Sequence, residues 1–422
     1  MPFILYGLLR WAFVYYMETT WIIAPERRKI LLEVKIPQSV TRPLRAMEMF
    51  FNAYWVSYDP PTDWRTTLFE GKVILATSFE MASIEGVPHF YIRIPVTNRR
   101  LLEATLYAQY PNVELVEVPD YTATVPQDIP NKNWDMWGCD FMPLKPDVYP
   151  LKTYEEFFEE RTDTPDEEKR LDPLSNMLEL FSKIGKGEYI WFQIIALPIS
   201  PKEDPFVVNA KKEIDRLMFR SEPVKKQKSF IGELIGGFLS LFAITPADVS
   251  SLYHDSELTI PQTAEEKKEE LYPAELRLST GERNVVAAIE RKASKISYRS
   301  GLRFIYLAKK EVFNGGMKAF GPSFTAQFGS HDTNSLKPWK PTITKVQSPD
   351  FFKKSRLFFK KRDLFWRYTE RDFAPGNGYL ILGSDELATM FHFPGFEVAP
   401  VSALNRIEVK KVAAPTTLPV EE

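Results

Sequence analysis

Cysteine is almost absent from this chain, which has only Cys139 among its 422 residues. A single thiol cannot form an internal disulfide, and it cannot supply the several thiolates of a cysteine-based zinc cage. Histidine occurs only four times, and the four positions (89, 254, 331 and 392) are widely spaced. The composition therefore predicts no bound metal, and it fits a reducing compartment.

An excess of charge of either sign is also missing. The chain has 54 lysines and arginines against 56 aspartates and glutamates, so its bulk charge indicates no class of partner. With 44% hydrophobic and 14% aromatic residues, however, it can bury substantial cores. The length suggests two or three domains.

Motifs of common catalytic and nucleotide sites do not occur. The sequence has no G-x-x-x-x-G-K-[ST], H-E-x-x-H, G-x-S-x-G or C-x-x-C motif, and GKGEYIWF (185–192) has glycines and a lysine at the wrong spacing. We therefore predict no enzymatic activity, no catalytic residues, and no residues that bind a cofactor or a metal.

The first residues form an apolar stretch. Residues 2–17 are apolar apart from Arg10, and the basic cluster ERRK follows at 26–29. The stretch is shorter than the roughly 20 residues of a comfortable membrane span, and it lacks the cleavage site of a signal peptide. An interfacial helix and a buried helix remain alternatives, but we favour a membrane anchor over residues 1–24. The basic cluster would then hold the bulk of the chain on the cytoplasmic side.

Residues 25–125 show alternating strand and helix patterns. Strand-like and helix-like segments follow one another in the order βαββαβ, and Glu85-Gly86 is a hairpin signal between the two central strands. This order predicts a ferredoxin-like unit. We therefore expect an α+β protein.

The rest of the chain is predicted to contain a second such unit. Residues 126–187, rich in proline and then in acidic residues, are expected to be a connector. Residues 188–411 are expected to form a second ferredoxin-like unit with insertions at 221–278 and 315–377. Residues 412–422 are expected to be an extended tail.

The first insertion contains the apolar segment KKQKSFIGELIGGFLSLFAI (225–244). A polar and basic start followed by apolar residues is typical of a segment at a membrane surface, although a helix buried against a protein partner has the same pattern. The candidate membrane contacts are Phe230, Ile231, Leu234, Phe238, Leu241 and Phe242.

The second insertion is basic and aromatic. Between residues 318 and 372 there are twelve lysines and arginines against five acidic residues. Cations interleaved with aromatic rings suit nucleic acid, and they also suit anionic lipid headgroups. A solvated loop with buried aromatic stems is the alternative without a ligand. The candidate contact residues are Lys353, Lys354, Arg356, Lys360, Lys361, Arg362, Trp366 and Arg367.

A histidine in GSDELATMFHFPG (383–395) could look functional at first sight. Ser384 suits a helix N-cap, the apolar residues that follow recur at helical spacing, and Pro394 ends the pattern. We therefore predict that His392 packs at the end of a short helix and is not catalytic.

Six segments follow one another in an order that resembles a known family. They are LLEVKIP to AMEMFFNAYW (31–55), SFEMASIEGVPHFYIRIP (78–95), LYAQYPNVELVEVPDY (106–121), LKPDVYPLKTYEEF (144–157), GERNVVAAIERKAS to GLRFIYLAKKEVFN (281–314) and DELATMFHFPG (385–395). Together they closely resemble a membrane-anchored family of candidate-phyla bacteria whose function is unassigned. Its members are similar to the N-terminal region of, or a neighbour of, type IV secretion and conjugation ATPases of the FtsK/HerA type. The resemblance covers about residues 25–422.

This resemblance implies a non-enzymatic, membrane-anchored component of a type IV secretion-like or DNA-transfer machinery. Such a component would act as a platform for a separate FtsK/HerA-type ATPase, with membrane lipid, possible nucleic acid and a possible homo-oligomer as further partners. A peripheral membrane adaptor without a nucleic-acid role is the alternative. The resemblance implies no cofactor for this chain.

Overall fold

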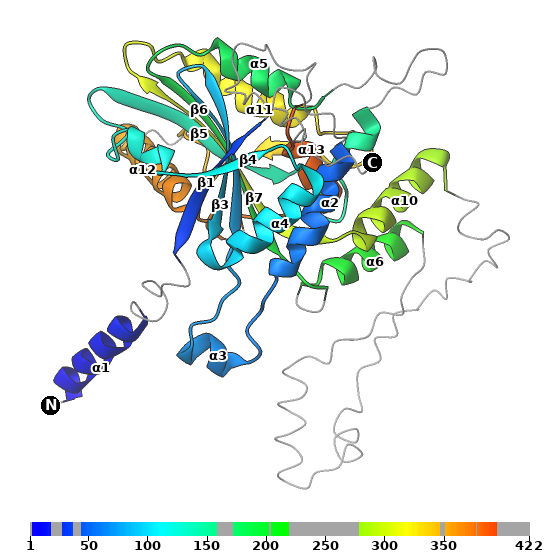
Figure 1. Cartoon of the computed structure of the whole chain (residues 1–422), viewed down its shortest axis with the longest axis horizontal. Helices are drawn as coiled ribbons and strands as arrows, with labels where there is room; N and C mark the ends of the chain where they lie inside the picture. Colours follow the sequence, from blue (N-terminus) through cyan, green and yellow to red (C-terminus); the bar gives the residue numbers. More distant parts are fainter. Residues whose placement is uncertain are drawn as a thin grey trace, which may run out of the picture. The chain divides into compact units, whose positions relative to one another are not determined.

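The computed structural model describes residues 2–17, 28–36, 44–157, 172–201, 204–218, 278–346, 351–376 and 378–394. Within these ranges the protein is a mixed α+β structure built around one antiparallel sheet (Figure 1). The nine strands of that sheet are β1 (Lys29–Lys35), β2 (Thr77–Ile84), β3 (Val87–Pro95), β4 (Glu114–Val118), β5 (Trp134–Pro143), β6 (Glu188–Pro198), β7 (Ser297–Lys309), β8 (Leu336–Pro338) and β9 (Leu380–Gly383).

The described residues also form α-helices and short 3-10 turns. The α-helices of the described residues are α1 (Pro2–Met17), α2 (Leu44–Tyr54), α3 (Trp64–Phe69), α4 (Arg99–Gln109), α5 (Ser175–Lys183), α6 (Phe206–Leu217), α10 (Thr280–Ser294), α11 (Phe320–Ala326), α12 (Lys353–Glu370) and α13 (Ser384–Met390). Short 3-10 turns are η3 (Trp55–Ser57), η4 (Val96–Asn98), η5 (Tyr121–Thr124), η6 (Tyr154–Phe157) and η7 (Gly315–Ala319).

The strand order across the sheet is β4-β1-β3-β2-β6-β7-β5-β8, and β9 pairs with β7. Strand β7 is long enough to pair along one edge with β6 and along the other with both β9 and β5. All of these pairs are antiparallel. The described strands therefore form one continuous sheet.

The two faces of the sheet carry two separate hydrophobic cores. Because side chains alternate along a strand, Trp191 and Phe192 of β6 face opposite cores. Helices α2, α4, α5, α11 and α13 contribute to the larger core. Helix α12 contributes Leu364, Phe365 and Tyr368 to the smaller one. Figure 1 shows α12 on one side of the sheet and α2 and α4 on the other. Burial on both faces explains why the central strands are almost continuously apolar.

The second ferredoxin-like unit is not formed as predicted. In such a unit the first two strands are parallel, because a crossover helix joins them, and the third strand lies between them. Here β6 and β7 are direct antiparallel neighbours, and β9 lies beyond β7. The prediction is wrong for these strands, because β6 and β7 are antiparallel and pair directly, so β9 cannot lie between them. Residues 406–411, predicted as the last strand, lie outside the described residues.

The predicted connector contributes to the sheet. Strand β5, within residues 126–187, pairs with β7 and β8. Its residues Met136, Cys139 and Phe141 are buried in the two cores. The dense prolines on both sides of this strand led to the connector prediction, although the strand's own side chains are mostly apolar.

Two smaller expectations concern helices. Helix α1 is present, and its described side chains, such as Leu5 and Trp11, are mostly exposed. No helix among the described residues combines the length and the hydropathy that a membrane crossing requires. A capping box begins α10, because the Ser279 amide donates to Glu282 Oε2 at 2.8 Å and the Glu282 amide donates to Ser279 Oγ at 3.3 Å.

Candidate functional site: the outer face of helix α12

The predicted basic and aromatic segment forms helix α12, which lies against the smaller core. The helix buries Leu364, Phe365 and Tyr368, a stripe with the spacing of one helical face. Trp191 of β6 stacks on two of these rings, with centroid distances of 6.4 Å to Phe365 and 5.1 Å to Tyr368. The inner face of α12 is therefore an aromatic contact with the centre of the sheet.

The helix ends at an unusual residue. Arg371 adopts the left-handed conformation, with φ of 58°, a position where glycine is usually preferred. Its amide bonds to Tyr368 O at 3.1 Å, and the Asp372 amide bonds to Arg367 O at 2.9 Å, which is the Schellman pattern. Arginine in place of glycine costs backbone energy, so its side chain must compensate.

A row of polar side chains crosses the sheet beneath α12. Glu80 of β2, Gln193 of β6, Arg303 of β7 and Asp140 of β5 are successive cross-strand partners, and all four are buried. Neighbours in such a row have Cβ atoms about 5 Å apart and interact directly. The row therefore places two carboxylates, an amide and a guanidinium side by side in an otherwise apolar region.

Arginines from α12 and its cap complete this row. Arg371 Nε lies 2.9 Å from Glu80 Oε1, and its Nη2 lies 3.0 Å from Asp120 Oδ1. Arg367 Nη1 lies 3.0 Å from Asp140 Oδ2, whose other oxygen accepts from Arg303 Nε at 2.6 Å. We call this set of residues (Glu80, Asp120, Asp140, Gln193, Arg303, Arg367 and Arg371) the α12 clamp.

Within the clamp, Glu80 and Arg371 stabilise each other's charged form. Burial alone would raise the pKa of Glu80, but the charge of Arg371 and the hydrogen bonds to Arg371, Ser78 and Tyr121 outweigh it, so that this pKa is lowered. Burial has the largest single effect on Arg371 and by itself would lower its pKa. Glu80 and the other partners together outweigh burial and raise this pKa well above its ordinary value. These directions keep both groups ionised, so the clamp is suited to holding α12 in place.

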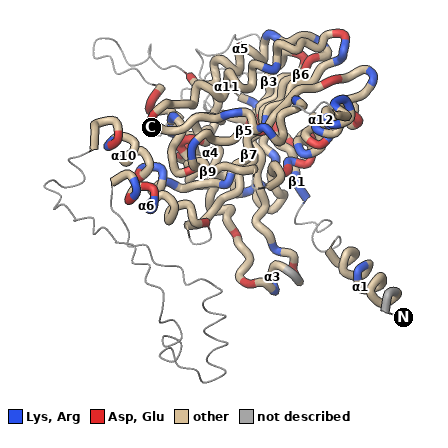
Figure 2. The backbone as a smooth tube through the Cα atoms, turned by 180° about the vertical axis from the view of Figure 1, so that it is seen from behind, with Lys and Arg blue, Asp and Glu red and all other residues tan. Residues whose placement is uncertain are grey.

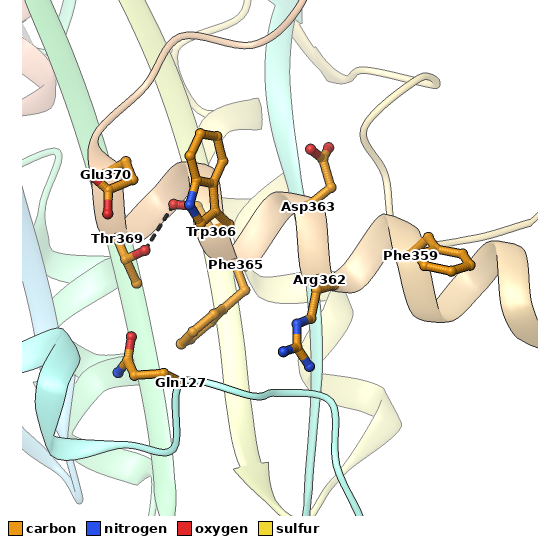
Figure 3. Close-up of a pocket in the computed structure, with 8 residues that line it drawn as sticks. All are labelled: Gln127, Phe359, Arg362, Asp363, Phe365, Trp366, Thr369 and Glu370. Atoms are coloured by element: carbon orange, nitrogen blue, oxygen red, sulfur yellow. Dashed lines mark hydrogen bonds between the residues drawn. The ribbon is translucent and has the colours of Figure 1, made fainter. Parts of the chain in front are cut away.

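The outer face of α12 exposes several large rings. Phe359 is 67% exposed and Trp366 is 55% exposed. Phe351 and Phe352, directly before the helix, are more exposed than either. A groove of about 510 Å³ lies along this face. It is lined by Gln127, Phe359, Arg362, Asp363, Phe365, Trp366, Thr369 and Glu370 (Figure 3). Figure 3 shows Arg362 and Phe365 directed to the Gln127 side of the helix, and Trp366 directed to the other.

The structure separates the predicted contact residues into two groups. Lys353, Lys354, Arg356 and Arg362 are exposed, together with Trp366 (Figure 2 shows lysines and arginines along α12). Arg362 also donates to Asp128 O at 3.0 Å.

The other predicted contacts are held by the protein itself. Arg367 is only 4% exposed and bonds to Asp140 and Asp363, so its prediction as a ligand contact is wrong. Lys361 forms an ion pair with Asp135, and Lys360 lies 3.5 Å from Lys340 O. An α-helix must present one face inward, and a count of charges along the sequence does not identify that face.

Other predicted positions have simpler outcomes. Phe230, Ile231, Leu234, Phe238, Leu241 and Phe242 lie outside the described residues. In the described ranges, no group of three or more histidine, cysteine, aspartate or glutamate side chains is arranged to hold a metal.

His392 packs at the helix end, as predicted. It is 2% exposed, its Nδ1 lies 3.0 Å from Ala388 O, and its Nε2 lies 2.9 Å from Asp172 Oδ1.

Sequence reasoning did not find the α12 clamp. The signal was present as isolated charged or polar residues inside apolar strands, such as Glu80 in SFEMAS, Asp140 in GCDFM and Arg303 in LRFIYL. A buried charge requires a partner, so each of these residues indicates a counter-charge elsewhere. The identity of that counter-charge depends on strand pairing that the sequence does not reveal.

Comparison with known proteins gave no relative from which to transfer a function. The sequence matches no protein-family model and none of the curated proteins.

Proposed function

We propose that this chain is a non-enzymatic, membrane-associated component of a type IV secretion-like or DNA-transfer machinery, and that the outer face of α12 contacts the transferred nucleic acid. The observation that carries the proposal is the combination, on one clamped helix, of exposed aromatic rings with exposed cations. The sequence resemblance supports the type of machinery and the presence of a separate FtsK/HerA-type ATPase as partner.

Nucleic acid suits this surface for a physical reason. Bases stack on aromatic side chains whatever their identity, and each stacked base contributes about 1–3 kcal/mol. Nearby lysines and arginines neutralise phosphates and release counterions. Phe359 and Trp366 provide rings along the groove, while Lys354 and Arg362 provide charge on the same helix.

The clamp makes the surface effective. Buried ion pairs and hydrogen bonds attach α12 and its C-cap to the four strands β2, β5, β6 and β7, so its exposed residues keep their positions before a ligand arrives. Pre-organisation of this kind reduces the entropy lost on binding.

The fold supports the platform role. Along the chain, β1, α2, β2, β3, α4 and β4 follow the βαββαβ order, and the corresponding strands lie in the order β4-β1-β3-β2. We propose that residues 29–118 are a ferredoxin-like unit, extended by the remaining strands into a broad sheet. Such a sheet provides a rigid body that can carry a membrane segment, a nucleic-acid contact and an ATPase dock at separate places.

The test is salt-dependent binding of single-stranded DNA to the full-length chain. We expect Lys354→Glu with Arg362→Glu to weaken binding by more than tenfold. The slope of log K against log salt should also become shallower, by about 0.7 for each phosphate that the protein no longer neutralises. Trp366→Ala should weaken binding with little change in that slope, since it removes stacking. The matched control, Arg100→Glu with Lys183→Glu, makes the same charge change on α4 and α5 on the opposite face of the sheet.

Equal losses in the control pair would show that binding depends on overall charge alone, and the α12 assignment would then fail. The partner is tested separately by affinity capture from detergent extracts, with the bound proteins identified by mass spectrometry. Recovery of an FtsK/HerA-type ATPase supports the platform model.

A second candidate function is a peripheral membrane adaptor. It is favoured by the exposure of Phe351 and Phe352, at 78% and 82%, directly before the basic residues of α12. Exposed rings beside cations also suit the interface of an anionic bilayer. Binding to anionic vesicles without any affinity for DNA would select this function over the first.

A further inference from the structure

A second basic site lies away from the outer face of α12, at the end of the sheet where β1 begins. It is a pocket of about 430 Å³ between β1, β3 and the segment that follows β4. The pocket is lined by Arg28, Lys29, Ile30, Leu31, Arg93, Glu117, Val118, Pro119 and Asp120. The register explains why the cations gather, since Arg93 of β3 is the cross-strand partner of Leu31, two residues from Lys29.

The three cations of this pocket have few partners. The side chains of Arg28 and Lys29 form no hydrogen bond and no ion pair with the residues that the structure describes. Among the described residues, the Arg93 side chain donates only to a backbone carbonyl, Glu370 O, at 3.3 Å. These guanidinium and ammonium groups therefore keep donors available for a ligand.

Among the described residues, the two carboxylates of the lining form no hydrogen bond or ion pair with these cations, because each is paired elsewhere. Glu117 Oε2 lies 2.6 Å from Arg99 Nη1. Asp120 accepts from Arg371 and from the Thr122 amide. The direct ion pairs of both acids are thus with Arg99 and Arg371, which do not line the pocket.

The charge balance around Lys29 points the same way. Burial, followed by the charges of Arg93 and Arg371, lowers the pKa of Lys29, while Glu370 and Asp372 oppose this shift without cancelling it. Burial and then Arg371 also lower the pKa of Arg93, while Glu80, Asp120 and Glu370 oppose this shift without cancelling it. A bound anion would relieve the repulsion among these cations.

The position of the pocket indicates the source of the anion. Eleven residues (18–28) separate Lys29 from the apolar helix α1, a length that spans at most about 40 Å when fully extended. The segment that carries α3 enters β2 at the same end of the sheet, and it exposes Trp64 and Phe69 by 63% and 60%. Figure 1 shows α3 projecting beyond that end. Exposed tryptophan beside basic residues is typical of a protein surface at a bilayer interface.

We propose that Arg28, Lys29 and Arg93 bind the phosphate of an anionic lipid headgroup at the membrane surface. The ligand chemistry is a phosphate ester. The lipid is its source because an apolar helix precedes the site by only eleven residues in the chain, and the exposed rings of the α3 segment lie at the same end of the sheet. This inference rests on the proposed membrane association, but not on the nucleic-acid role of α12. The pocket would orient the sheet with its β1 end toward the bilayer.

The test uses the full-length chain and vesicles of phosphatidylcholine with and without phosphatidylglycerol. The quantity measured is the increase in binding that phosphatidylglycerol causes. The apolar contribution of α1 is the same for both vesicle compositions, so it cancels in this difference. We expect Lys29→Gln with Arg93→Gln to reduce this increase about tenfold, since cations close to an anionic surface contribute strongly to binding. The matched control, Lys186→Gln with Lys310→Gln, removes two charges at the opposite end of the sheet. Lys29→Gln alone removes no side-chain hydrogen bond or ion pair among the described residues, so it guards against a loss of folding.

Three results would overturn the proposal. One is an unchanged phosphatidylglycerol effect in the double variant and in Lys29→Gln. Another is full competition by inorganic phosphate at concentrations near the lipid affinity, which would assign the pocket to a free anion. The third is loss of DNA binding in these variants with lipid binding intact. Vesicle binding that survives Lys354→Glu with Arg362→Glu, while DNA binding is lost, keeps this site distinct from the α12 face.

Discussion

Replacing Arg371 by methionine is expected to loosen α12 at a large cost in stability. The side chain of Glu80 is 0% exposed and its main counter-charge is Arg371, which bonds to both of its oxygens at 2.9 and 3.1 Å. Removing one partner of a buried ion pair typically costs about 3–5 kcal/mol, because the remaining charge is left without compensation. Methionine has a similar volume, so loss of packing adds little.

The effect should depend on pH. In the native protein the pKa of Glu80 is below its ordinary value, so its contribution to stability is present above its unfolded pKa and is lost as the pH falls through the folded pKa. Without Arg371, the effect of burial, already the largest single cause, is no longer outweighed, and this pKa is raised. The variant should therefore be less and less affected as the pH falls through about 4 and below, and most affected above neutral pH.

Urea unfolding of both proteins across this pH range measures the difference directly. The double variant Glu80→Gln with Arg371→Met should recover most of the loss, because a neutral amide needs no counter-charge. Arg371→Gly should be less damaging than Arg371→Met by about 1 kcal/mol, since glycine accepts the left-handed conformation. A loss for Arg371→Met that is below about 1 kcal/mol, or that does not change with pH, would refute the account of the clamp.

Two further predictions concern other buried positions. Burial raises the pKa of Asp147 to about 6, so its charged form destabilises the fold above that pH. In denaturant unfolding, Asp147→Asn should therefore add up to about 3 kcal/mol of stability near pH 8 and almost nothing near pH 4. An equal gain at both pH values would contradict this. At Gly321 an added Cβ would lie 2.6 Å from the Phe304 ring, so Gly321→Ala should destabilise the protein by about 1–3 kcal/mol. The control is Gly315→Ala, whose added Cβ meets no atom within 4 Å. Equal effects of the two changes would show that the Phe304 contact is relieved without cost.

Much of the local structure follows from the sequence alone. The alternation of apolar residues in β3, the hairpin signal at Glu85-Gly86 and the capping box at Ser279 depend on residues close in sequence, and each of these features is present in the structure. The packing of His392 was also predictable, because Pro394 and the apolar spacing around it are local signals.

The sheet and the site were decided by tertiary structure. Pairing between β6 and β7 joins segments about a hundred residues apart, and no local pattern distinguishes it from the pairing expected of a second ferredoxin-like unit. The same holds for β5, whose apolar residues gain a partner only when β7 is in place. Charge alone could not separate Arg362, which faces the groove, from Arg367, which is buried against Asp140. Local propensity and periodicity depend on near neighbours, whereas register and the pairing of buried charges depend on which distant segments meet.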